Sequence, residues 1–263
     1  MTRVSVVEWP DGLSPGSQEW DRIRAEIDHA KPELLITNEM PFGQWAPTTR
    51  TYDRDIAARW ADLHETAMSD LAALGVARVL STRPVLAQGF LVNEAFLLEE
   101  GNYRFPHHKH LFPSEPDWEE ASWFKPVTYG FTPQPSGKTV VGALVCTELM
   151  FPQYARLLGQ RQAQLIGVPR ATGANHDLWR SAAVMAAVTA GAFVASSNRV
   201  KGKSSTIAFG GGGFIVDPHG KLLVATSKEQ AIATAEIDEA FADAAKQEYP
   251  AYVSDDHLAG KSL

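Results

Sequence analysis

The chain has 263 residues, a net charge of −7 and a single cysteine, with 44% hydrophobic and 21% charged residues. Such a composition is typical of a globular protein, and the length suits one α/β domain. The acidic balance disfavours nucleic-acid binding, which needs a basic face, and one cysteine excludes an intrachain disulfide framework and a multi-cysteine zinc site. We expect a single domain over residues 1–263, with a short polar tail from about 248.

Neither a leader nor a membrane span is predicted. Residues 1–8 read as a first strand and lack the long apolar core of a signal peptide. The longest weakly polar run, residues 182–197, is shorter than the roughly 20 residues that a membrane span needs. We therefore expect a soluble, cytoplasmic protein with no membrane partner.

The first part of the chain alternates strands and helices. Residues 4–7 and 34–37 are apolar runs that predict strands, and helical spacing of apolar residues predicts helices over 14–30 and 55–74. Gly75 ends the second of these helices. Two further strands are expected at residues 76–81 and 90–98.

Residues 101–135 differ from the rest, because they are rich in Pro, His, Trp and Glu and show no sustained period. A long irregular stretch inside a domain is usually functional or disordered. Its many aromatic residues favour ordered packing here.

Beyond this stretch the pattern ends in consecutive strands, which favours one domain with a mixed sheet. The sequence Asp217-Pro218-His219-Gly220 is typical of a hairpin turn. The expected helices are 153–162 and 177–191, and the expected strands are 140–145, 165–168, 193–197, 214–216, 222–225 and 232–237.

Three reactive side chains fall at comparable places. Glu39 follows the strand at 34–37, Cys146 follows the strand at 140–145, and Lys109 lies in the irregular stretch. A thiol at a strand end, just before a helix, is well placed to be an exposed nucleophile, and strand ends are where open α/β sheets assemble their sites. Taken singly, each has an ordinary interpretation: a packing cysteine, a solvated glutamate and a surface lysine.

Histidines surround Lys109, at positions 107, 108 and 110. Such a cluster can bind metal, but a fixed ammonium among the ligands would repel a cation. No His-x-x-x-His helix lies nearby, so we expect no metal site.

These residues stand in motifs that resemble the Glu–Lys–Cys signature of the nitrilase superfamily of carbon–nitrogen hydrolases. The order and spacing match, and the resemblance extends from about residue 3 to 237. Its motifs are Asn38-Glu39-Met40-Pro41-Phe42, Lys109-His110-Leu111-Phe112 and Cys146-Thr147-Glu148-Leu149-Met150-Phe151-Pro152. Later landmarks are residues 179–191, 195–198 and 213–220.

The resemblance implies a fold and an assembly. The family fold is a four-layer α-β-β-α sandwich with mixed sheets, usually assembled as a homodimer or larger homo-oligomer through one helical face. A second glutamate often completes the family's site between the lysine and the cysteine. Glu120 is preferred here over Glu119 because it directly precedes the Ala-Ser-Trp run, although a solvated acidic pair is the alternative.

The resemblance also implies a mechanism without a cofactor. Cys146 would attack the carbonyl carbon and form a thioester, with Glu39 as proton acceptor and later as activator of water. Lys109 and the backbone N–H of Thr147 would stabilise the oxyanion, and Glu120 would orient Lys109 and the substrate.

The flanks of the cysteine favour a small amide as substrate. True nitrilases of the family carry Trp directly after the cysteine and then Glu, whereas this chain has Thr147-Glu148. N-carbamoyl-amino-acid hydrolases usually carry arginines where Met150 and Phe151 stand. A nitrilase remains the alternative, and a catalytically silent binding or assembly protein of the same fold is a further one.

Candidate substrate contacts come from residues around these motifs. Thr147, Trp45 and Phe151 are assigned to the substrate pocket, with Trp118 and Trp123 as further aromatic candidates, although large aromatics near a site are more often packing residues. Arg170 is assigned to a polar group of the substrate, with an ordinary loop arginine as the alternative.

Overall fold

The computed structural model describes residues 1–127 and 130–254. Two six-stranded sheets form its centre, with strand orders β12-β1-β2-β3-β4-β5 and β11-β10-β9-β8-β7-β6. The first contains β1 (Thr2–Val7), β2 (Leu34–Ile36), β3 (Arg78–Ala87), β4 (Phe90–Glu99), β5 (Asn102–His108) and β12 (Ile232–Ile237). The second contains β6 (Gln134–Ser136), β7 (Thr139–Ala143), β8 (Leu165–Arg170), β9 (Phe193–Asn198), β10 (Phe214–Val216) and β11 (Leu222–Ala225).

Both sheets are mixed. In the first, β1, β2 and β3 are parallel, while β12, β4 and β5 join antiparallel. In the second, β7, β8 and β9 are parallel, and β10 pairs antiparallel with β9 and with β11. The turn predicted at 217–220 connects β10 to β11 and is confirmed as a hairpin.

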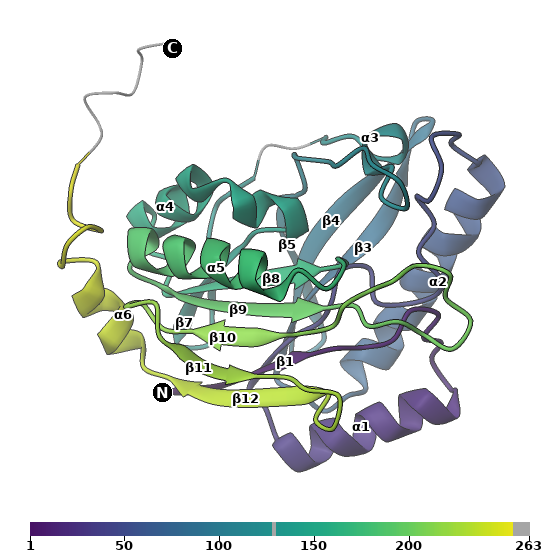
Figure 1. Cartoon of the computed structure of the whole chain (residues 1–263). Helices are drawn as coiled ribbons and strands as arrows, with labels where there is room; N and C mark the ends of the chain where they lie inside the picture. The colour runs from purple at the N-terminus through teal and green to yellow at the C-terminus, as the bar shows by residue number, and fades with distance from the viewer. Residues whose placement is uncertain (128–129, 255–263) are drawn as a thin grey trace, which may run out of the picture.

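Helices cover both outer faces, which completes the four-layer α-β-β-α sandwich (Figure 1). Helices α1 (Gln18–Ala30) and α2 (Arg54–Ala72) pack on the first sheet, and α4 (Pro152–Gln160) and α5 (His176–Ala190) pack on the second. Strand alternation assigns the faces: Leu34 and Ile36 point between the sheets, whereas Leu35 contacts the α1–α2 layer. The expected fold class is confirmed.

Side chains set where the helices begin and end. Ser17 caps α1 by accepting a hydrogen bond from the Trp20 N–H, so this helix starts later than the apolar spacing predicts. Asp53 caps α2 in the same way. Gly191, with φ of 58°, ends α5 in the left-handed conformation that glycine adopts at low cost.

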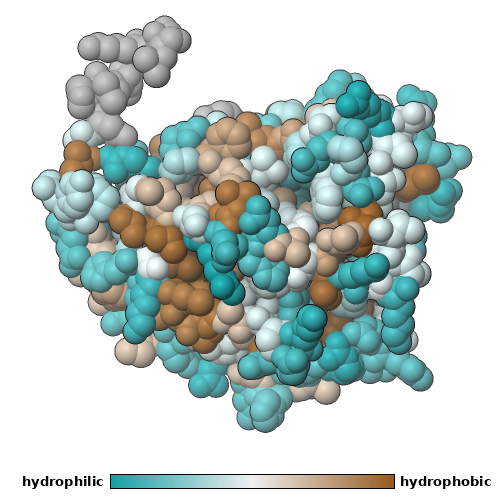
Figure 2. Space-filling view, viewed as in Figure 1, coloured by the Kyte–Doolittle hydropathy of each residue, from teal (hydrophilic) through white to brown (hydrophobic). Residues whose placement is uncertain are grey.

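The outer face of the second sheet's helix layer carries apolar side chains at the surface. Leu178, Val184 and Met185 of α5 are exposed, and so is Leu222 of β11. Figure 2 shows apolar residues gathered over this part of the molecule, where α5 lies in Figure 1.

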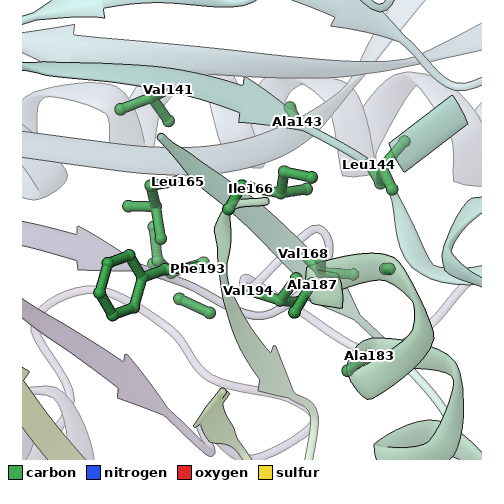
Figure 3. Close-up of a cluster of buried hydrophobic side chains, with 14 of the residues drawn as sticks. Val141, Ala143, Leu144, Leu165, Ile166, Val168, Ala183, Ala187, Phe193 and Val194 are labelled. Carbon is green, nitrogen blue, oxygen red and sulfur yellow. The ribbon is translucent and has the colours of Figure 1, made fainter. Parts of the chain in front are cut away.

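The largest core cluster fills the space between the sheets and beneath α4 and α5. In Figure 3, Val168 of β8 and Val194 of β9 lie near Ala187 of α5. Small alanine side chains let this helix approach the sheet closely, because no bulky group separates the two backbones.

Two local expectations differ from the structure. The stretch 101–135 is not wholly irregular, because it contains β5, the short helix α3 (Glu120–Trp123) and the start of β6. A last helix, α6 (Glu239–Ala245), also follows the closing strand and was not expected. The predicted tail begins after α6, and its residues 255–263 lie outside the described residues.

No helix within the described ranges is both long and apolar enough to cross a membrane.

Candidate active site

Cys146 lies at the turn that follows β7 and opens the 3-10 helix η1 (Cys146–Met150). Its φ of 51° is in the left-handed region, which is uncommon for a residue with a Cβ and is found disproportionately at functional sites. The thiol is only 2% exposed, so the expectation of an exposed nucleophile is wrong at the level of the side chain. The tight turn points the residue into a cavity within the fold.

Glu39 lies in the loop after β2, and the second sheet holds this loop in place. The Glu39 N–H donates to the Arg170 carbonyl at the end of β8, at 3.1 Å. The buried Arg199 guanidinium, just after β9, donates to the Glu39 carbonyl at 3.2 Å. The loop is therefore fixed across the interface between the two sheets, and the Glu39 carboxylate is fully buried.

Lys109 lies directly after β5, and its backbone N–H donates to the Asn93 carbonyl at 2.9 Å. Its ammonium contacts two carboxylates, Glu39 Oε1 at 2.8 Å and Glu120 Oε2 at 2.6 Å. All three side chains are fully buried. Two of the three predicted reactive groups are thus in direct contact, and Glu120 joins them.

The adjacent glutamates at 119 and 120 have different partners. Glu120 contacts Lys109, whereas Glu119 accepts from Arg50 at 3.2 Å and from the Ser114 hydroxyl at 2.8 Å. Glu119 and Glu120 are successive residues at the start of α3, so their carboxylates point in different directions. That of Glu119 points toward Arg50 and that of Glu120 toward Lys109.

Asn93 is a site residue that the sequence reasoning did not identify. Its amide donates to Glu39 Oε1 at 2.7 Å, so the same oxygen receives bonds from Asn93 and Lys109. The signal was the polar pair Asn93-Glu94 inside the mostly apolar strand β4, where a buried amide needs a partner.

Charge and burial set the protonation of the site. Burial opposes the ammonium of Lys109, but Glu120 and Glu39 outweigh that effect and raise the pKa of Lys109 above its ordinary value. Burial raises the pKa of Glu120, although the nearby Lys109 charge opposes this. Burial, followed by the charge of Glu39, raises the pKa of the Cys146 thiol. Lys109 is therefore charged and the resting thiol is neutral.

Two buried carboxylate oxygens remain available. Glu39 Oε2 and Glu120 Oε1 have no hydrogen-bond partner in the described part of the chain. Leaving such groups unpaired in a dry interior is costly unless a ligand, water or proton meets them. These oxygens can accept a proton or a substrate N–H.

Cys146 opens onto a cavity of about 310 Å³, which suits a small molecule. Trp118 and Trp179 contribute aromatic walls, and Thr147 and Glu120 contribute polar groups. The full lining is Pro113, Glu115, Trp118, Glu120, Cys146, Thr147, Ala171, Thr172, Gly173, Ala174, Asn175, Leu178 and Trp179.

The other predicted substrate contacts lie elsewhere. Trp45 packs in a buried cluster against Trp60, and its indole N–H donates to the Asp117 carbonyl. Phe151 is 38% exposed, beyond the cavity lining. Of the predicted pocket residues, Thr147 and Trp118 line the cavity.

Arg170 is fully buried and already has partners. Its guanidinium donates to the Ser196 hydroxyl at 2.7 Å and to the Gly212 carbonyl at 2.9 Å, and it lies over the Trp179 ring at 4.9 Å. It therefore supports Trp179, a wall of the cavity, from behind.

Two of the three histidine side chains near Lys109, those of His107 and His108, contact carboxylates. His107 Nε2 lies 2.8 Å from Glu148 Oε2, and His108 Nε2 lies 3.3 Å from Glu94 Oε2. The described residues contain no group of three or more His, Cys, Asp or Glu side chains that could hold a metal ion.

Fold and site together define a class of α-β-β-α sandwich proteins with a Glu–Lys–Cys centre at the ends of buried strands. The chain belongs to the carbon-nitrogen hydrolase family, whose sequence model matches residues 30–247. The expected family is confirmed.

Characterised relatives are distant. An N-carbamoylputrescine amidase of Solanum tuberosum is 29% identical over 155 residues, which cover 52% of this chain and 50% of that protein. An (R)-stereoselective amidase of Pseudomonas sp. is 28% identical over 177 residues, 65% of this chain and 61% of that protein. The match thus spans about half the length of the first relatives.

Solved structures of similar fold cover nearly the whole chain. A carbon-nitrogen hydrolase from Helicobacter pylori G27 has a TM-score of 0.79 at 20% identity and covers 95% of this chain and 94% of its own. A mutant amidase from Nesterenkonia sp. AN1, in complex with butyramide, has a TM-score of 0.75 at 21% identity and covers 92% and 93%. At these identities the likeness establishes the fold.

Proposed function

We propose that the protein hydrolyses a small non-peptide amide to a carboxylate and ammonia, through a thioester on Cys146. The observation that carries this proposal is the buried contact of Lys109 with Glu39 and Glu120, close enough to Cys146 that all three charges act on its thiol. Such an arrangement has little use in a purely structural core, because burying three ionisable groups is costly.

The first step is attack by sulfur on the amide carbon. The resting thiol is neutral, so a base must take its proton as the carbon–sulfur bond forms. Glu39 is suited to this role, since Asn93 and Lys109 fix one of its oxygens and leave the other free to accept the proton. The electron pair of the carbonyl moves onto oxygen.

That oxyanion needs fixed positive charge. Lys109 supplies it, because its raised pKa keeps the ammonium charged across the physiological range. The backbone N–H of Thr147 lies in the first turn of η1, where an N–H has no partner within the helix, and can donate to the same oxygen.

Collapse of this intermediate breaks the carbon–nitrogen bond. Glu39 returns its proton to the departing nitrogen, ammonia leaves, and the acyl group stays on Cys146. A water molecule then attacks the thioester while Glu39 takes its proton, which releases the carboxylate and restores the thiol. Glu120 orients Lys109 throughout.

The cavity favours a neutral acyl group. Its aromatic and aliphatic walls suit a short apolar chain, and the charged side chains among its described lining residues, Glu115 and Glu120, are both acidic. None of these lining residues is a cation that could pair with a substrate carboxylate, and the Lys109 ammonium already contacts Glu39 and Glu120. The butyramide complex of the Nesterenkonia amidase supports a small aliphatic amide, and the amidase names of the relatives agree with this class.

A panel of amides and nitriles tests the proposal through released ammonia. We expect wild-type protein to release ammonia from short aliphatic amides such as butyramide, and Cys146→Ala to release none while keeping the wild-type melting temperature. Cys146→Ala removes only the sulfur atom, so an unchanged melting temperature would show that the loss of activity does not come from unfolding.

The other outcomes separate the alternatives. Release from nitriles but not from amides would replace the proposal with a nitrilase. No release from either class, together with an unreactive Cys146 thiol, would indicate a catalytically silent protein of the same fold.

We also propose a homo-oligomer whose subunits meet at the apolar face of α5. Leu178 and Met185 are 50% and 53% exposed there, and contact between two copies would remove both from water. The cytoplasmic location stays a prediction.

A further inference from the structure

We propose that Glu148 and His107 are positioning residues, which fix the Cys146 turn to the strand end that carries Lys109. This inference rests on the proposed roles of Cys146 and Lys109. It adds two residues that take no part in the chemical steps above.

A single carboxylate bridges the two segments. Glu148 Oε2 accepts from the Val145 N–H at 2.8 Å, on the residue directly before the nucleophile. The same oxygen lies 2.8 Å from His107 Nε2, and Oε1 accepts from the His110 N–H at 2.7 Å. Glu148 therefore bonds to residues on both sides of Lys109 in the chain, His107 before it and His110 after it.

The protonation pattern of the bridge follows from its partners. The Phe131 N–H donates to His107 Nδ1 at 3.3 Å, so the proton of the neutral ring is on Nε2 and points at Glu148. All three partners of Glu148 are then donors. A carboxylate can accept from all three, whereas a glutamine would turn its NH₂ toward at least one N–H.

The cysteine turn needs such a support. Cys146 holds a φ of 51°, and a strained conformation of this kind persists only where its surroundings over-determine it. Glu148 accepts the N–H directly before that residue while being fully buried itself. Charge-assisted bonds of this length are about twice as strong as neutral ones.

Neither Glu148 nor His107 is among the described lining residues of the Cys146 cavity. They therefore act through the residues they hold, and they set where the sulfur lies relative to the Lys109 ammonium. A displacement of about 1 Å between such groups can cost about a hundredfold in rate.

A matched pair of variants isolates the bridge. His107→Gln keeps an N–H donor at the distance of Nε2, whereas His107→Asn keeps an acceptor near Nδ1 for Phe131 but cannot reach Glu148. His108→Gln is the control, because His108 is next in the same strand and contacts Glu94 instead.

Two readouts are needed. Because the chain has one cysteine, the rate of iodoacetamide labelling followed by intact mass reports Cys146 alone and needs no substrate. On any amide that is turned over, kcat and KM are measured separately. We expect His107→Asn to lower both the labelling rate and kcat by about ten- to a hundredfold with little change in KM. His107→Gln and His108→Gln should stay within about threefold of wild type.

Glu148→Gln provides the second test and should reproduce the loss. Equal rates for the Asn and Gln variants at 107, or wild-type labelling in folded Glu148→Gln, would overturn the proposal. Failure of Glu148→Gln and His107→Asn to fold would assign the bridge to stability alone and overturn it too. If no amide is turned over but the labelling pattern holds, the proposed function fails and the positioning role stands.

Discussion

At the scale of single residues, Glu39 and Cys146 could be predicted from their types and their places after apolar runs, whereas Lys109 was predicted within the irregular stretch. Glu39 follows β2 and Lys109 follows β5 in the first sheet, while Cys146 follows β7 in the second, so the site joins strand ends of both sheets. Their mutual contacts could not be predicted, because hydrogen bonds such as Lys109 to Glu39 join residues far apart in the chain.

Residues that support the reactive groups or the cavity wall were either not predicted or predicted in a different role. Asn93 and His107 carry no motif, and their roles depend on partners from distant segments, Glu39 in the loop after β2 and Glu148 in η1. Arg170 was assigned to the substrate, yet hydroxyl and carbonyl groups around it engage its guanidinium. A sequence does not reveal whether a buried arginine points into a cavity or behind its wall.

The adjacent glutamates give a matched test of the site. Glu120→Gln removes the charge beside Lys109, so the ammonium loses its closest ion pair and its fixed orientation. We expect kcat for amide hydrolysis to fall about a hundredfold. Steady-state kinetics on the amide panel provide the measurement.

Glu119→Gln is the control for that experiment, because Glu119 contacts Arg50 at the surface side of α3. It should retain activity within about twofold. A larger loss in Glu119→Gln than in Glu120→Gln would contradict the assignment of Glu120 to the site.

At the scale of elements, long periodic helices and apolar strands were predictable, because their burial pattern repeats locally. The strand β5 was not, since it carries polar residues: Arg104 contacts Glu99, and His108 contacts Glu94. These polar residues interrupt the apolar alternation that predicts a strand, so the sequence of β5 does not reveal it. The short helix α6 depends on its Asp238 cap.

Helix α2 contains a buried histidine that should make the protein sensitive to acid. Burial lowers the pKa of His64 from about 6.5 to about 4, and its ring nitrogens bond the Trp60 carbonyl and the Phe42 N–H. Between these two values the unfolded chain binds the proton and the folded one does not. Stability is therefore lost as the pH falls from 6.5 toward 4, by up to about 3 kcal/mol.

Chemical denaturation at several pH values measures this loss. His64→Gln keeps an acceptor near Nε2 for the Phe42 N–H and does not titrate, so the drop in the free energy of unfolding between pH 7 and pH 4.5 should be smaller than in wild type. His29→Gln, at an exposed position of α1, should leave the drop unchanged. Equal drops in wild type and His64→Gln would show that His64 does not titrate as described.

At the scale of the whole molecule, the two sheets and their packing depend on distant pairings. The first strand β1 pairs with the last strand β12, and Glu39 bonds to the end of β8 in the other sheet. Such contacts are non-local and leave no trace in a local pattern. The sandwich was predictable only through the resemblance to a known family.

The apolar face of α5 predicts assembly. Met185→Glu would place a charge in the proposed contact between subunits, so we expect its sedimentation mass to fall toward the monomer while wild type sediments as a dimer or larger species. Leu86→Glu, at an exposed position of β3, is the matched control and should keep the wild-type mass. A wild-type monomer at all concentrations would rule out this interface.

The central claim is that Cys146 carries the acyl group of an amide. Intact-mass measurement during turnover of a slow amide tests it most directly, because the chain has one cysteine and an adduct can be mapped to it. The account predicts a mass increase equal to the acyl group, located on Cys146 and absent from Cys146→Ala. Ammonia release from amides by Cys146→Ala, or steady turnover with the acyl group on any other residue, would contradict it.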